Sequence, residues 1–337
     1  MTAACLWTPD VCWHQASRTP PSAGRTSPPA VVPDRHLPVR PNLDQLRQQA
    51  RDLLRDVRRG DSTAVAELQK HHPGAIEPDA ARLAHTQLAL ARSYGLTGWW
   101  RLVLACRMTD AIWRDDVNAV RTLIVNHPRL LHEDARGVRG NWGPPMSYAA
   151  NLGRDRIIEM LHGLGATDLQ HAFDRACLQG QIDVARRLHG LGARPFPGSV
   201  MGSCETQNAE GLAYLLELGA DLTDEHGDRL APIALILQTY SRNARGKHEC
   251  LELVATHGIV LPDTPPIAVH RGRTDLLERH LQHDPQLPTR TFAHEEIIRR
   301  SSGVPRTTRW RCTARRSRVP RCCTCAWTST KSISRDG

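Results

Sequence analysis

The 337-residue chain lacks the sequence features of several large classes of protein. No apolar stretch approaches the ~20 residues of a membrane helix, and none is long enough for the core of a signal peptide. The motifs GxxxxGK(S/T) and GxSxG are absent, as is a GxGxxG after a strand-like run, so the usual phosphate cradles and nucleophile turns are missing. We therefore predict a cytoplasmic protein without membrane contact or catalytic activity.

Cysteine and histidine are present, but without the spacing of a metal site. The ten cysteines do not form two CxxC pairs. The run from His294 to Glu296 begins like a zincin motif, but Ile298 stands where the second histidine belongs. We expect no metal and no cofactor. Buried thiols are expected at four helical positions, Cys106, Cys177, Cys204 and Cys250.

A fixed 27-residue spacing is the main feature that the sequence does contain. The triplet Leu-Gly-Ala recurs at residues 164–166, 191–193 and 218–220, each time at the end of an apolar helical stretch. Gly153 and Gly180 stand twelve residues before the first two of these glycines. Such a period is typical of a solenoid, in which each unit is a helix pair that cannot bury its apolar face alone.

The apolar residues between the paired glycines keep one pattern. They stand four, five and eight residues after the first glycine, as Ile157, Ile158 and Leu161 do after Gly153. These offsets place the side chains on one helical face. The closing glycine, here Gly165, suits a helix C-cap that needs a positive φ.

Other units keep the pattern with altered ends. Gln207 takes the place of the first glycine in the third unit, and Gly246 precedes Gly258 by the same twelve residues. Units that begin at Asp115 and Gly272 close at a proline, which stops a helix because it lacks an N–H group.

One unit resembles the ankyrin repeat, whose pattern is TPLHxAAxxGxxxIVxxLLxxGAD. The matching positions are residues 144–150, Gly153, Ile157, Ile158, Leu161, Gly165 and Ala166. The resemblance implies an all-α, ankyrin-type helical solenoid of about six repeats over residues 109–297, which binds another protein. Because the 27-residue spacing is about six short of the usual ankyrin period, we expect short fingers between the repeats.

Residues 37–108 are predicted to form an N-terminal helical module. Apolar residues over 43–57 follow a helical spacing, and further helices are expected after Asp61, over residues 80–94 and from Trp99. The module can cap the solenoid by covering the apolar face of its first repeat.

The start of this module is similar to a segment of known proteins. Residues 37–54 look like the helical segment that precedes ankyrin repeats in some bacterial proteins. The resemblance implies a bacterial ankyrin-repeat protein. Residues 1–36, rich in proline, serine and arginine, are expected to be a disordered leader.

The net charge of +9 belongs to the C-terminal segment. Residues 298–337 contain ten arginines, one lysine and a single acid, whereas the remaining 297 residues hold 33 basic and 34 acidic side chains. We interpret this segment as a disordered, out-of-frame translation of a seventh repeat. Back-translated residues 310–317, read one base earlier, permit LALHGTPL, which contains the ankyrin turn GTPL. The alternative is a basic arm that binds nucleic acid.

Aromatic residues are the leading candidates for binding an unidentified protein partner. Trp142 lies where a finger loop precedes the first helix of a repeat, and Tyr148 lies on that helix. Fingers and first helices form the concave surface of such a solenoid, where exposed Trp, Tyr and Arg anchor interfaces. Alternatively, Trp142 folds back over the core of the neighbouring repeat. Further candidates on first helices or adjoining segments are Arg175, Gln179, Met201, Glu205 and Tyr240.

Overall fold

The computed structural model describes residues 33–239, 241 and 243–292. In this part of the chain all regular structure is helical and no strand occurs, which confirms the all-α prediction. The described residues divide into two compact units, the first ending at Phe196 and the second beginning at Pro197. This division falls inside the range that we expected to form one repeat array.

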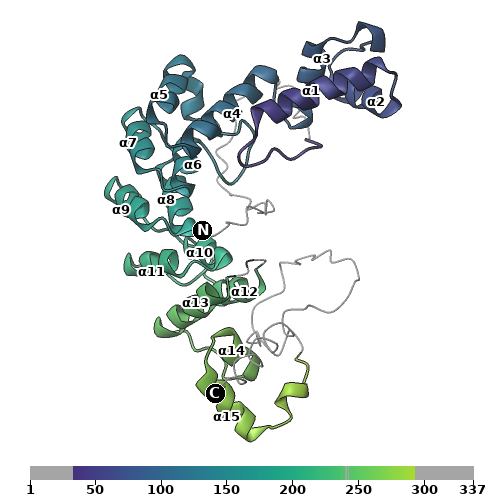
Figure 1. Cartoon of the computed structure of the whole chain (residues 1–337). Helices are drawn as coiled ribbons and strands as arrows, with labels where there is room; N and C mark the ends of the chain where they lie inside the picture. The colour runs from purple at the N-terminus through teal and green to yellow at the C-terminus, as the bar shows by residue number, and fades with distance from the viewer. Residues whose placement is uncertain (1–32, 240, 242, 293–337) are drawn as a thin grey trace, which may run out of the picture. The chain divides into compact units, whose positions relative to one another are not determined.

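Unit 1 contains the N-terminal module and the first helix pairs (Figure 1). Its α-helices are α1 (Leu43–Arg58), α2 (Ser62–His71), α3 (Leu83–Ser93), α4 (Trp99–Trp113), α5 (Val117–Asn126), α6 (Pro145–Asn151), α7 (Asp155–Gly163), α8 (Leu169–Gln179) and α9 (Ile182–Gly190). Short 3-10 turns lie at Pro78–Ala80 and Pro128–Leu131. The boundary that we expected after residue 108 falls inside α4.

Unit 2 repeats the helix-pair arrangement. Its α-helices are α10 (Val200–Thr206), α11 (Ala209–Glu217), α12 (Ala231–Gln238), α13 (Ala244–Thr256), α14 (Pro265–His270) and α15 (Thr274–His283). A 3-10 turn follows at Leu287–Thr289. None of the described helices in either unit is long and apolar enough to span a membrane.

The N-terminal module begins at a well-formed helix cap. The Asn42 side chain accepts hydrogen bonds from the backbone N–H groups of Asp44 and Gln45, which satisfies two donors at the start of α1. The helix α1 buries the apolar stripe that the sequence predicted. That stripe packs in two clusters against α2, α3 and α4; its buried members are Leu46, Ala50, Leu53 and Val57.

The module also includes the last residues of the expected leader. The backbone N–H groups of Asp34 and Arg35 donate to the Ser93 carbonyl at 3.1 and 3.0 Å. The Asp34 carboxylate pairs with Lys70 at 2.5 Å. Residues 33–36 therefore belong to the packed module, which corrects the expected boundary at residue 36. Residues 1–32 and 293–337, including the basic segment 298–337, lie outside the described residues.

From α4 onward the helices of unit 1 form pairs that stack on one another (Figure 1). The first helices of successive pairs, α4, α6 and α8, contact one another, and the second helices α5 and α7 also meet. In unit 2, α10 contacts α12 and α11 contacts α13 in the same way. The prediction of repeated helix pairs is thus confirmed. The expected short finger occurs between α7 and α8, at residues 164–168, whereas the longer segments 127–144 and 218–230 connect α5 to α6 and α11 to α12.

Left-handed backbone conformations mark the turn inside most pairs. Gly153 and Gly180 have φ of 67° and 69°, values that cost glycine little because it lacks a Cβ atom. Asp115 and Gln207 take the same position in their units with φ of 57° and 55°. The 27-residue spacing therefore records the backbone requirement of this turn, even where glycine is replaced.

Gly246 departs from this pattern. It lies in the first turn of α13 and not in a left-handed turn, so the twelve-residue spacing to Gly258 was misleading there. A Cβ atom at Gly246 would overlap the Gln207 carbonyl oxygen. This glycine is therefore needed for close approach between the pairs α10–α11 and α12–α13.

The last described helix pair is less covered than the others. None of the residues of α15 is buried. Its three leucines, on the apolar face that the sequence predicted, are only partly buried: Leu276, Leu277 and Leu281. In a repeat protein this face is the one that a further repeat would cover.

Candidate functional site

Trp142 and Tyr148 are buried side chains that pack against each other. Trp142 is 8% exposed and Tyr148 is 0% exposed, and their ring centroids are 4.9 Å apart. Trp142 precedes α6 and folds back onto it, because a large aromatic ring gains most when it is removed from water. The interpretation of these two residues as exposed interface anchors is therefore corrected, and the alternative of a core-covering Trp142 is supported.

The Tyr148 hydroxyl joins three segments of unit 1. It accepts a hydrogen bond from the Trp113 indole N–H at 2.7 Å and donates to the Val39 carbonyl at 2.8 Å. Burial raises the pKa of Tyr148, so the phenol keeps the proton that it donates. Tyr148 thereby fastens α6 to α4 and to the chain before α1.

Arg175 on α8 is likewise a structural residue. It is 8% exposed, and its Nε donates to the Asn151 side-chain oxygen at 2.8 Å. Asn151 in turn donates to the Ser147 carbonyl at 2.8 Å. The Ser147 hydroxyl and backbone N–H both donate to Asp168, just before α8. These polar side chains link neighbouring first helices rather than forming a reactive group.

The remaining predicted candidates are divided between the two units. Gln179 on α8 is half-buried and belongs to unit 1, whereas Met201 and Glu205 on α10 are half-buried and belong to unit 2. The Glu205 carbonyl accepts a hydrogen bond from the Thr239 hydroxyl at 2.7 Å. Tyr240 lies outside the described residues.

The cysteines behave as buried apolar residues. The four that lie in the described ranges are free and buried, which confirms the prediction for Cys106, Cys177, Cys204 and Cys250. Burial raises the pKa of the Cys106, Cys177 and Cys250 thiols to about 12. Protonated thiols are poor metal ligands and poor nucleophiles. Within the described residues, no three His, Cys, Asp or Glu side chains gather as a metal site would require.

One partly buried carboxyl group has a strongly shifted pKa. Burial raises the pKa of Asp174 on α8 to about 7, against the opposing effect of a hydrogen bond from Gln170 at 3.2 Å. Burial also lowers the pKa of the neighbouring His171. Perturbed groups can mark functional sites, but Asp174 and His171 are only half-buried and do not line the groove described below.

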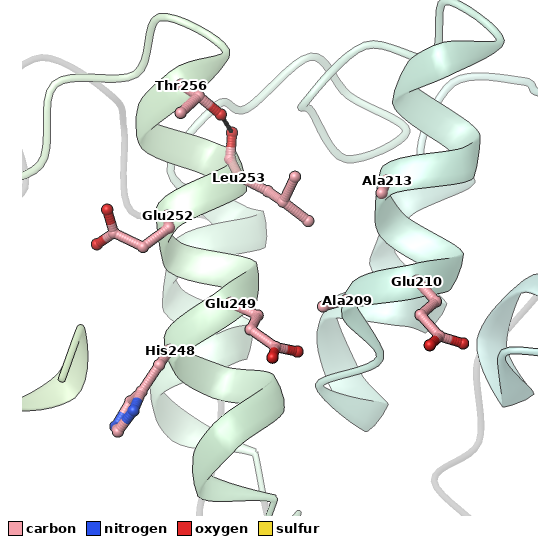
Figure 2. Close-up of a pocket in the computed structure, with 8 residues that line it drawn as sticks. All are labelled: Ala209, Glu210, Ala213, His248, Glu249, Glu252, Leu253 and Thr256. Atoms are coloured by element: carbon pink, nitrogen blue, oxygen red, sulfur yellow. Dashed lines mark hydrogen bonds between the residues drawn. The ribbon is translucent and has the colours of Figure 1, made fainter.

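A surface groove that the sequence analysis missed lies between α11 and α13. It has a volume of about 480 Å³ and is lined by Ala209, Glu210, Ala213, His248, Glu249, Glu252, Leu253 and Thr256. Figure 2 shows Leu253 and Glu249 reaching from α13 toward Ala213 and Ala209, with Glu210 at the outer edge of α11. We call this feature the α11–α13 groove.

Small side chains explain why the groove is open. Ala209 and Ala213 lie one turn apart on α11, so at these two positions the helix presents only methyl groups to the groove. Leu253 fills part of the space between the helices. The floor is therefore apolar and only partly filled.

The acidic groups around the groove differ in their pairing. Glu249 pairs with Arg245 at 2.7 Å, and Glu252 accepts two hydrogen bonds from Arg271 at 2.5 and 3.0 Å. The Arg271 hydrogen bonds lower the pKa of Glu252. Glu210 on α11 has no ion-pair partner within the described part of the chain.

Comparison with protein-family models gives no match for this chain, and comparison with curated proteins gives none either.

Proposed function

We propose that this chain is a non-catalytic protein-binding module built from ankyrin-type repeats. The observation that carries the proposal is that polar side chains of the repeats are engaged in hydrogen bonds within the fold. The hydrogen bonds that link the neighbouring first helices α6 and α8 involve four such side chains: Ser147, Asn151, Asp168 and Arg175. The groove that remains at the surface has an apolar floor, a feature of side-chain recognition at interfaces.

The repeated helix pairs support the same proposal. Stacked repeats form a scaffold in which each pair depends on its neighbours, while outward-facing residues vary freely and supply specificity. The similarity of residues 37–54 to a segment of bacterial ankyrin-repeat proteins supports a bacterial origin. The free thiols of the four described cysteines are those of a protein in a reducing compartment, which supports a cytoplasmic location.

Affinity capture with the purified full chain tests this function. After cross-linking in a native lysate and nuclease treatment, we expect one or a few proteins to be enriched over an unrelated helical repeat protein. Recovery of nucleic acid in a parallel capture without nuclease, lost when residues 298–337 are deleted, would favour the basic-arm alternative. Enrichment of nothing over the control would contradict the proposed function.

A further inference from the structure

The helix pair α10–α11 lies in an unusually acidic part of the sequence. The whole chain has 44 Lys and Arg residues, yet none occurs over residues 195–228. That stretch covers α10, α11 and most of the loop before α12. It contains seven acids: Glu205, Glu210, Glu217, Asp221, Asp224, Glu225 and Asp228.

Part of this charge lies in a stripe along the second helix of the pair. Glu210, Ala213 and Glu217 are spaced three and four residues apart, so they share one face of α11. Glu210 and Glu217 are exposed, as is Asp221 just beyond the helix. None of these three acids has an ion-pair partner within the described residues.

These charges affect the fold in different ways. Glu210 lies in the first turn of α11, where a negative charge is favourable. Glu217 is the last residue of α11, where a negative charge is unfavourable because the helix dipole is negative at that end. Like charges also repel one another when they lie within a Debye length, about 8 Å. A partner that brings positive charge relieves both costs.

The apolar groove beside this stripe supplies the second half of a docking surface. Its floor is formed by Ala209 and Ala213 on α11 and by Leu253 on α13, and Glu210 stands at its edge (Figure 2). Interfaces combine an apolar centre with a charged rim that selects and orients the partner.

We infer that the α11–α13 groove binds a basic segment of a partner protein. An aliphatic side chain of that segment lies on Ala209, Ala213 and Leu253, and its Lys or Arg residues lie near Glu210 and Glu217. This inference rests on the proposed protein-binding function and adds the chemistry of the partner.

The test uses the full-length chain and a labelled synthetic peptide with leucines at helical spacing and four arginines. We expect the peptide to bind with an affinity that falls as salt rises. A peptide with glutamates in place of the arginines, or serines in place of the leucines, should bind at least about tenfold more weakly, an effect of about 1.4 kcal/mol. Equal binding of the serine peptide would overturn the groove as the site.

A matched pair of variants locates the binding. Glu210→Lys should weaken peptide binding about tenfold, or about 1.4 kcal/mol. Asp183→Lys is the control, because Asp183 lies 27 residues earlier, in the first turn of α9, and is fully exposed. The control should change binding less than about twofold. Equal effects of the two variants would overturn the inference.

Ala213→Glu separates the groove from general electrostatic attraction. The substitution adds a negative charge but removes the apolar floor, so the groove predicts weaker binding of the basic peptide. Non-specific attraction predicts tighter binding, and that result would overturn the inference.

A second probe, a peptide of residues 298–337, distinguishes a partner from the chain's own basic segment. If this probe binds more tightly than the arginine–leucine peptide, with the same dependence on Glu210, the groove binds the chain's own segment. That result would overturn the inference that it binds a partner protein. If a protein is captured from lysate equally well by the Glu210→Lys variant, the α11–α13 groove is not the binding site, while the proposed protein-binding function stands.

Discussion

The helix pairs α8–α9 and α10–α11 share a repeat register but have different surfaces. Positions 27 residues apart are buried in both pairs, as Phe173 and Val200 are, and as Leu188 and Leu215 are. Both pairs turn through a left-handed residue, Gly180 in one and Gln207 in the other. The interior and the turn therefore keep to the repeat.

The exposed residues of the two pairs do not follow the repeat. On α9, Arg187 pairs with Asp155 of the preceding repeat, and Arg186 pairs with Asp183 at 3.7 Å. The pair α10–α11 has no Lys or Arg at all. Since both pairs fold alike, the surface ion pairs add little to the fold, as expected for exposed charges. Surface charge in this protein is thus free to serve recognition.

Truncation of the core should give the largest effect. Phe173→Ala removes a fully buried ring from α8 and should lower the free energy of unfolding of unit 1 by about 3–5 kcal/mol. Val200→Ala at the equivalent position of α10 removes two methyl groups and should cost roughly 1.5 kcal/mol in unit 2. Urea unfolding followed by circular dichroism measures both. Equal losses would mean that the two positions are not packed as the repeat implies.

The turn position should give the next largest effect. Gly180→Ala places a Cβ atom on a left-handed residue and should cost about 1–2 kcal/mol, with a smaller cost for Gly180→Asn. Gln207→Gly should change stability little. Glycine removes the strain of the left-handed backbone at this position. The substitution also removes the hydrogen bond from the Gln207 amide to the Ile236 carbonyl, which is worth about 0.5–1.5 kcal/mol. Thermal melts that rank Gln207→Gly with Gly180→Ala would contradict this comparison.

The two units should respond to pH in opposite directions. Burial raises the pKa of Asp174 to about 7, above its unfolded value near 4, so folded α8 binds more protons between these pH values. Its stability should fall as pH rises from about 4 to about 7, by at most about 1.4 kcal/mol per pH unit. Burial, with Lys247 and His248, lowers the pKa of His270 on α14 to about 4. The stability of α14 should therefore rise between about pH 4 and 6.5.

Hydrogen exchange resolved by segment, corrected for the intrinsic pH dependence of exchange, measures both trends. Asp174→Asn should flatten the trend in α8 without changing α14, and His270→Gln should do the reverse. Parallel trends in α8 and α14 would show that these two groups do not control the pH response.

The smallest effect should come from the acidic stripe. Glu217→Gln removes a negative charge from the C-terminal end of α11 and should raise stability by about 0.3–1 kcal/mol at low salt. Asp183→Asn, near the N-terminal end of α9, should lower stability by a similar amount. Melts at low and high salt compare them. A loss of stability in Glu217→Gln would mean that this charge supports the fold.

Part of the architecture was readable from the sequence because it follows local rules. Helix spacing depends on neighbouring residues, so the helix pairs were predicted correctly. Gln207 was placed at the position of the first glycine, but its left-handed conformation was not predicted. The exposure expected of three residues proposed for binding, Trp142, Tyr148 and Arg175, was wrong, because exposure is not a local property. Trp142 on a loop looks the same in sequence whether its ring faces water or packs on Tyr148.

The sequence by itself determined an all-helical chain of repeated pairs, since apolar period and turn glycines act within a few residues of one another. The sequence also shows that residues 195–228 contain no Lys or Arg. This absence indicates a binding surface only once α11 is known to lie beside α13. The tertiary structure decided which polar side chains form hydrogen bonds between helices. It also decided that Gly246 lies against the Gln207 carbonyl, and where the α11–α13 groove lies. These outcomes depend on contacts between residues distant in sequence, whose geometry is set by the packing of whole helices.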